Sequence, residues 1–79
     1  MNAVQCRMAR AAVGLGIREL ARRAGVAIDT IARLERGDTL RPRTIAAIRD
    51  ALAEAGVEFI EADDFAGVGV RLSKQGGSE

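Results

Sequence analysis

Glycines divide the first 56 residues into four short segments, and the apolar residues of each segment recur with the spacing of a helix. Apolar side chains at positions i, i+3, i+4 and i+7 share one face of a helix, and a glycine permits the sharp turn that follows it. The glycines at these breaks are Gly14, Gly16, Gly25, Gly37 and Gly56. Because the whole chain has only 79 residues, short helices around one shared core are the natural way to bury its apolar surface.

Start signals and apolar faces together predict where the helices lie. Asn2 followed by Gln5 is typical of a capping box, which opens a helix through about Val13. The next helices are predicted over 17–24, over about 27–36, and from about Pro42 to Gly56. The residues expected to face inward are Cys6, Ala9, Val13, Ile17, Leu20, Ala21, Ala24, Ile31, Leu34, Ile45, Ile48, Leu52 and Ala55.

After Gly56 the spacing of apolar residues changes from 3.6 to 2, which indicates strands. Val57 and Phe59 form one alternating run. Val68, Val70 and Leu72 form the other. We therefore predict a mainly α fold of four to five helices with a C-terminal β-hairpin. Its expected parts are a helical domain over 1–56, a hairpin over 57–72 that packs on it or serves dimerisation, and a disordered tail over 73–79.

The net charge of +1 hides a strong asymmetry along the chain. Residues 1–49 carry ten arginines and four acidic residues, a net charge of +6, whereas residues 50–79 have a net charge of −5. Eleven of the twelve basic residues are arginine, the side chain best suited to bidentate contact with phosphate. The first half of the chain is therefore suited to a phosphate-bearing partner.

Composition excludes several other classes of function. The chain has no histidine and one cysteine, which removes a histidine base, most zinc sites and an internal disulfide. Cys6 is expected to be a small buried hydrophobe. The sequence offers no nucleophile–base pair and no phosphate-cradling glycine loop, and the acidic turn around Asp63 has too few ligands for calcium. We expect no enzyme activity, no metal or cofactor and no membrane span, in a protein of the cytoplasm.

Two short helices around Gly25 match a helix-turn-helix unit, whose second helix lies in the DNA major groove. Residues 10–52 resemble the Cro/CI (XRE-type) repressor domain, and the ending AGVEFI…GVGVRL resembles small bacterial members that finish in strands. The residues that carry the resemblance are Gly14-Leu15, Glu19-Leu20-Ala21, Gly25, Ile31, Leu34-Glu35, Gly37, Arg41-Pro42-Arg43 and Ala51-Leu52.

The resemblance implies that double-stranded DNA is the partner and that the third predicted helix reads it. The positions that are commonly polar in the family hold Ile17, Ile28 and Asp29 here, and the usual capping positions hold Gly16 and Ala27. Ile28 can touch a thymine methyl group or belong partly to the core. Asp29 can accept from a cytosine amino group or serve as a first-turn anion favoured by the helix dipole.

Basic and hydroxyl side chains around these positions complete the predicted DNA-binding set. Thr30 and Arg33 are expected on the outer face of the third helix, and Arg36, Arg41 and Arg43 around the following loop. The full set is Ile28, Asp29, Thr30, Arg33, Arg36, Arg41 and Arg43. The resemblance also implies a structural ion pair between Glu35 and Arg10 or Arg7.

Two functions remain open from the sequence. The first is a DNA-binding repressor, as a homodimer that would suit two half-sites one helical turn apart. The second is a protein-binding regulator that has lost sequence readout, such as an antiactivator that sequesters a transcription factor. Its contact patch would comprise Ile17, Ile28, Val68 and Val70.

Overall fold

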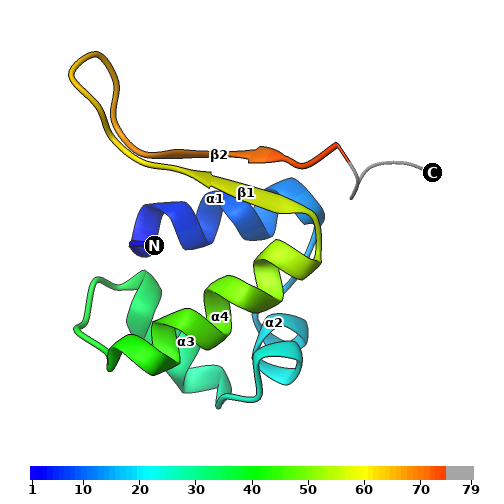
Figure 1. The fold of residues 1–79 in the computed structure, drawn as a ribbon. Coiled ribbons are helices and arrows are strands. Elements are labelled where there is room, and N and C mark those ends of the chain that lie inside the picture. The colour runs from blue at the N-terminus through cyan, green and yellow to red at the C-terminus, as the bar shows by residue number, and fades with distance from the viewer. Residues whose placement is uncertain (75–79) are drawn as a thin grey trace.

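A computed structural model of the protein describes residues 1–74. Its elements, in chain order, are the helices α1 (Ala3–Val13), α2 (Ile17–Ala24), α3 (Ile28–Glu35) and α4 (Pro42–Glu54) and the strands β1 (Val57–Ile60) and β2 (Gly69–Leu72) (Figure 1). The predicted fold class, mainly α with a C-terminal antiparallel hairpin, is confirmed, with four helices in the described part of the chain.

The capping signals explain where the first two helices begin and end. The side chain of Asn2 accepts from the backbone N–H of Gln5, and the side chain of Gln5 accepts from the backbone N–H of Asn2, so the predicted capping box is present. Gly14 and Gly25 end α1 and α2 in the left-handed conformation, each with φ of 71°, which side chains rarely adopt.

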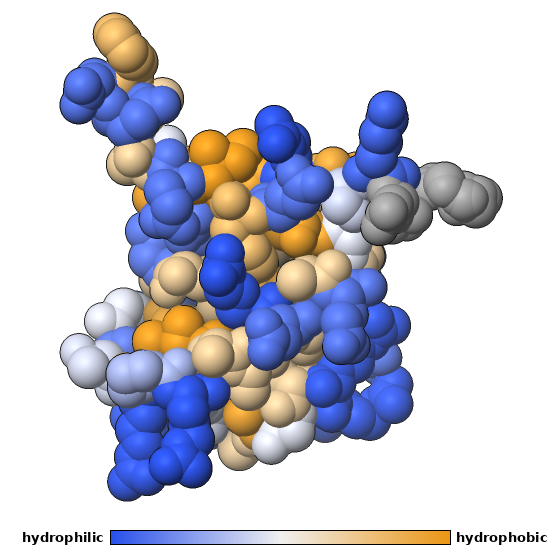
Figure 2. Space-filling model, viewed as in Figure 1, coloured by the Kyte–Doolittle hydropathy of each residue, from blue (hydrophilic) through white to orange (hydrophobic). Residues whose placement is uncertain are grey.

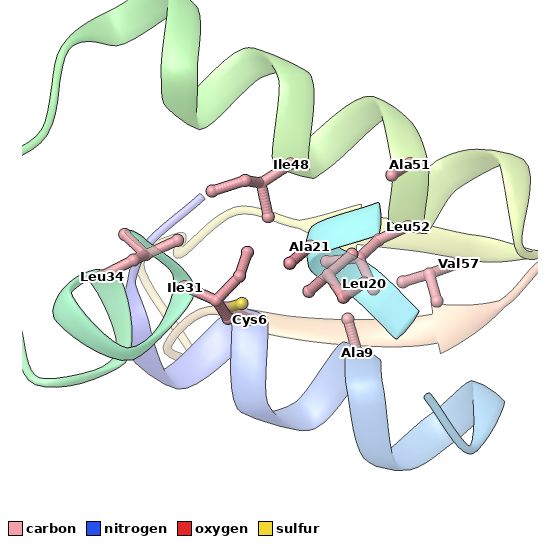
Figure 3. Close-up of a cluster of buried hydrophobic side chains, with 10 residues drawn as sticks. All are labelled: Cys6, Ala9, Leu20, Ala21, Ile31, Leu34, Ile48, Ala51, Leu52 and Val57. Atoms are coloured by element: carbon pink, nitrogen blue, oxygen red, sulfur yellow. The ribbon is translucent and has the colours of Figure 1, made fainter. Parts of the chain in front are cut away.

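The core lies where α1, α2, α3, α4 and β1 meet. Figure 3 shows its side chains pointing toward one another from these five elements. The buried apolar residues are Cys6, Ala9, Leu20, Ala21, Ile31, Leu34, Ile48, Ala51, Leu52 and Val57. All but Ala51 and Val57 were expected to face inward in helices, and Val57 was expected in the first strand.

The two strands pair in antiparallel register, with Val57 opposite Leu72 and Phe59 opposite Val70. The second strand begins at Gly69, so Val68 lies just outside the predicted strand rather than within it. Ser73, which the sequence placed in the disordered tail, donates from its backbone N–H to the carbonyl of Gly56 at 2.8 Å and continues the pairing. Lys74, the next residue of that predicted tail, is exposed, and 75–79 lie outside the described residues.

Gln5 joins the hairpin to α1. Its side chain is buried, and Nε2 donates to the carbonyl oxygens of Ile60 at 3.0 Å and Gly69 at 3.2 Å. Ile60 and Gly69 are paired across the two strands. The Gln5 amide nitrogen therefore donates to one carbonyl of each strand, at the end of the hairpin nearest its connecting loop. The amide oxygen of Gln5 completes the cap of α1.

The loop between the strands projects away from the body of the molecule (Figures 1 and 2). Asp63 orders it, because its Oδ1 accepts from the backbone N–H groups of Phe65 and Ala66, each at 2.8 Å. The backbone N–H of Asp63 also donates to the carbonyl of Ala66 at 2.9 Å. Phe65 is 96% exposed in this loop. Figure 1 shows the hairpin above α1, with α2 and α3 toward the opposite end of the molecule.

Candidate nucleic-acid interface

The pair of helices α2 and α3 is held by a short turn and by buried apolar side chains. The turn runs through Gly25, and the backbone N–H of Val26 donates to the carbonyl of Ala21 at 3.0 Å. Leu20 from α2 and Ile31 from α3 are fully buried in the shared core. Because these side chains fix the inner faces, the opposite face of α3 is left toward solvent.

The first turn of α3 presents the predicted base-reading positions. Ile28 is 44% exposed and is not among the residues that pack against the core, and Asp29 is exposed. Thr30 is half-buried, and Arg33 is exposed one turn further along α3. Ala27, which precedes the helix, makes no side-chain capping hydrogen bond.

An open groove of about 480 Å³ separates α3 from the start of α4. Apolar side chains line it together with hydroxyl and guanidinium groups. Its lining residues are Val26, Ala27, Thr30, Arg33, Thr39, Leu40, Arg41 and Thr44. Three of the predicted DNA-binding residues, Thr30, Arg33 and Arg41, are therefore brought together around one surface feature.

The predicted phosphate-binding arginines fall into two groups. Arg41 and Arg43, just before and within the first turn of α4, are exposed and have no acidic oxygen of residues 1–74 within 4.0 Å. Arg33 and Arg36 both face Asp38, at distances of 3.6 Å from Nε and 3.3 Å from Nη2 to the same oxygen, Oδ2. Within the described chain, only the first group is free of an acidic neighbour.

Glu35 ties α3 to α1 below this surface. Its side chain is 7% exposed, and Arg10 donates to both carboxylate oxygens, from Nε at 2.7 Å and from Nη2 at 2.8 Å. Arg10 Nη1 also donates to the carbonyl of Leu15 at 3.2 Å, and Arg7 Nη2 donates to the carbonyl of Glu35 at 2.6 Å. The arrangement fixes the C-terminal end of α3 relative to α1 through charge-assisted bonds.

Electrostatics around this pair keep Glu35 charged and Cys6 neutral. Burial acts to raise the pKa of Glu35, but hydrogen bonds from Arg10 and Cys6 and the charges of Arg10 and Arg7 outweigh it, so the pKa is lowered overall. Burial, followed by the hydrogen bond to Glu35, raises the pKa of Cys6 to about 12. A buried thiol that stays protonated is an unreactive packing group.

The predicted protein-contact patch is not assembled on the surface. Ile17, which helical spacing predicts to face inward and which the protein-binding alternative requires at the surface beside Ile28, is half-buried and packs against the core. The physical reason is the amphipathic spacing of α2, which places Ile17 on the same face as Leu20. Val68 is half-buried, and Val70 packs against the core from β2, so only Ile28 remains an exposed apolar side chain of that patch.

Sequence reasoning missed two acidic residues that shape the interface. Glu19 forms ion pairs with Arg22 and Arg23, and its Oε2 lies 2.9 Å from Nε of Arg23. The i, i+3 and i, i+4 spacing within one helix is a readable signal for these pairs. Asp38 lies beyond the end of α3, where no regular spacing predicts a partner.

The described residues hold neither a cluster of metal-ligating side chains nor a membrane-spanning helix. No group of three or more histidine, cysteine or acidic side chains within 1–74 is placed to hold a metal ion. None of the helices in that part of the chain is long and apolar enough to cross a membrane.

Comparison with protein families identifies the helical part of this fold. A family model described as a helix-turn-helix domain matches residues 3–61. The matched range starts with α1 and ends just after β1, so it includes the whole helical core, the turn at Gly25 and the groove. A comparison with curated proteins gave no significant match.

Proposed function

The chain belongs to the helix-turn-helix domain family, and from that premise we propose that it is a DNA-binding transcriptional regulator of the Cro/CI (XRE) type, acting as a repressor. In this proposal α3 lies in the major groove and its first turn faces the base edges. Arginines at the end of α3 and the start of α4 hold the sugar-phosphate backbone on either side.

One observation carries the proposal: the first turn of α3 and the unpaired Arg41 border the same open groove. Arg41 lines the groove together with Thr30. Arg43 is exposed in the first turn of α4. A helix can enter the major groove only if its flanks also meet the phosphates, and most protein–DNA hydrogen bonds are of that backbone kind. Basic side chains beside an exposed helix face supply both requirements.

Each predicted DNA-binding residue has a distinct proposed role. Arg41 and Arg43 bind backbone phosphates, and the hydroxyl of Thr30 donates a hydrogen bond to a phosphate or a base. Ile28 contacts a thymine methyl group, and Asp29 accepts from a cytosine amino group. Arg33 and Arg36 reach guanine or phosphate from the far end of α3. With apolar and acidic residues in the first turn of α3, the sequence readout depends on few direct hydrogen bonds.

A binding titration tests the proposal. DNA from around the protein's own gene is titrated at several salt concentrations, beside a duplex of scrambled sequence. We expect sub-micromolar binding to one site, with an affinity that falls steeply with salt. Arg43→Gln is expected to weaken binding to both duplexes, whereas the charge-matched control Arg71→Gln, in β2, leaves it nearly unchanged. Uniformly weak binding of every duplex by the wild type would contradict the proposal.

A second substitution separates readout from backbone attraction. Ile28→Gln replaces an exposed apolar side chain with one that can pair with adenine. We expect a change in which site is preferred, by about 1–3 kcal/mol per altered base pair, with little change on scrambled DNA. An unchanged order of preference among sites would remove Ile28 from the reading surface.

We also propose that the regulator binds as a homodimer. β2 is an edge strand of a two-stranded sheet, and its Leu72 is exposed. Pairing of β2 with its copy would cover Leu72 and extend the sheet. Light scattering at tens of micromolar tests this, because a monomer at that concentration would contradict pairing through β2.

Phe65 supports a second candidate function, contact with another protein such as a transcription factor. It is an almost fully exposed aromatic residue on an ordered loop, directly after the acidic Asp63 and Asp64. Ordered, exposed aromatic residues often anchor protein interfaces. Recovery of a specific protein by the wild type and its loss with Phe65→Ser would support this candidate, and recovery by both would count against it.

A further inference from the structure

Asp38 occupies the position between the two arginines at the end of α3. Its Oδ2 lies 3.3 Å from Arg36 Nη2 and 3.6 Å from Arg33 Nε. The backbone N–H of Asp38 donates to the carbonyl of Arg33 at 3.0 Å, which fixes the start of the loop. Two guanidinium groups from successive turns therefore converge on a single anionic oxygen.

This convergence is also what a phosphate oxygen would require. Guanidinium groups bind carboxylate and phosphate oxygens through the same charge-assisted hydrogen bonds. All three side chains are more than 40% exposed. Exposed ion pairs contribute little to folding. The ion pairs of Asp38 therefore shape the charge of the surface and contribute little to stability, unlike the buried ion pair of Glu35.

We propose that Asp38 is a built-in competitor for DNA phosphate at the Arg33–Arg36 pair. This inference rests on the proposed function and concerns the regulation of its affinity. In the free protein the carboxylate of Asp38 forms ion pairs with the guanidinium groups of both Arg33 and Arg36. When DNA binds, a phosphate oxygen takes its place, and the displaced negative charge of Asp38 remains close to the phosphate.

The competitor acts on every DNA sequence alike, because phosphates carry no sequence information. It weakens the general attraction that Arg33 and Arg36 would otherwise add to that of Arg41 and Arg43. Non-specific DNA then holds the protein less tightly, and the contacts of Ile28 carry a larger share of the binding free energy. Of the four arginines proposed to bind DNA, Arg41 and Arg43 have no acidic partner among residues 1–74 and attract phosphate freely, whereas Asp38 weakens the attraction of Arg33 and Arg36.

The test needs no known operator. Wild type, Asp38→Asn and the charge-matched control Asp50→Asn, on the exposed side of α4, are titrated with a short duplex of random sequence over a range of salt concentrations. We expect Asp38→Asn to bind about 3- to 10-fold more tightly, with a slope of log K against log salt that is steeper by about 0.9. Asp50→Asn should differ from wild type by less than about twofold, since it removes only a remote charge.

A double variant assigns the effect to the shared guanidinium groups. In the Arg36→Gln background, Asp38→Asn is expected to give a smaller gain in affinity than it gives alone. Asp38→Ser provides a second replacement, and circular dichroism checks that each variant is folded.

The outcomes separate the inference from the function on which it rests. Binding by the wild type with no difference between the Asp38 variants and Asp50→Asn would overturn the inference and leave the proposed function standing. Absence of binding by every folded variant at low salt would overturn both.

Discussion

At the residue scale, Glu35 and Asp38 show how burial changes the meaning of an ion pair. Glu35 is almost completely buried and is held at both oxygens by Arg10. The ion pairs of Asp38 with Arg33 and Arg36 are exposed to solvent. Loss of one partner from a buried pair leaves an uncompensated charge in a poorly hydrated place, whereas an exposed pair is replaced by water at little cost. The first pair supports the fold, and the second is available to ligands.

We predict that Glu35→Gln lowers the free energy of unfolding by about 3 kcal/mol at pH 7, because Arg10 loses its charged partner. Chemical denaturation measures the loss. Glu54→Gln, at the exposed end of α4, serves as the control and should be nearly neutral. A change no larger than that of the control would show that Glu35 does not hold α3 to α1.

The same variant carries a pH prediction. The pKa of Glu35 is lowered in the folded protein, so its contribution to stability is present above the unfolded pKa of about 4.3 and is lost as the pH falls through the lowered value. The difference in stability between wild type and Glu35→Gln should therefore be constant near neutrality and shrink in acid. A difference that stays constant down to the acid transition would contradict the assignment.

The two pairs also show what sequence alone can predict about the site. The family resemblance implied the pair of Glu35 with Arg10 or Arg7, and it singled out Arg33, Arg36, Arg41 and Arg43 as a group. The sequence could not say which of those arginines are already paired, because Asp38 reaches them through the path of an irregular loop. Side-chain partners in loops depend on backbone geometry that no residue spacing encodes.

At the element scale, the helices begin and end within two residues of where their sequence signals predict, but three of them, α2, α3 and α4, start without a side-chain capping hydrogen bond. Gly16 and Ala27 precede α2 and α3 in extended conformation, and neither offers a side-chain acceptor to the first turn. These helices are held in place mainly by packing of Leu20 and Ile31 in the core. Apolar spacing therefore predicted the helices better than capping residues did.

We predict that Ala27→Ser stabilises the protein by about 1 kcal/mol, because a serine at this position can accept from a free N–H in the first turn of α3. Gly16→Ser, in open space before α2, should add only a few tenths of a kcal/mol, since glycine is already a tolerable cap. Thermal and chemical denaturation compare the two. Equal effects of both variants would contradict the capping argument.

The hairpin was predicted from its period of two, and the prediction was correct in type but one residue early at β2. The attachment of the hairpin to α1 could not be predicted, since the sequence indicated Gln5 only as part of a capping box.

We predict that Gln5→Ala lowers the free energy of unfolding by about 1–3 kcal/mol, because two strand carbonyls lose their buried donor. The loss of the cap of α1 adds to this effect. Asn2→Ala removes the cap alone and should cost about 1 kcal/mol. Equal losses would mean that the amide contributes nothing to the hairpin.

At the scale of the whole molecule, the charge asymmetry of the sequence becomes a separation in space. The helix-turn-helix pair lies toward one end and the hairpin with its acidic loop toward the other (Figure 1). An acidic loop at the end remote from α3 does not oppose the approach of phosphates there. The loop that carries the exposed Phe65 projects at the opposite end (Figure 1).

We predict that Phe65→Ser changes the free energy of unfolding by less than about 0.5 kcal/mol, since the ring buries almost no surface in the monomer. Binding of DNA by this variant should equal that of the wild type. Denaturation and DNA titration measure the two properties. A clear loss of stability would mean that Phe65 is covered in solution, as a contact between copies would require.

The bond from Gln5 to the hairpin has a consequence for the order of folding. It joins residues 55 and 64 positions apart, so almost the whole described chain lies within the loops that it closes. Closing such long loops early costs conformational entropy that nearby helix contacts avoid. The helix-turn-helix pair can assemble from contacts close in sequence, and the hairpin then docks on α1 as a late step. During synthesis, the surface that carries α3 is therefore complete in sequence before the strands emerge.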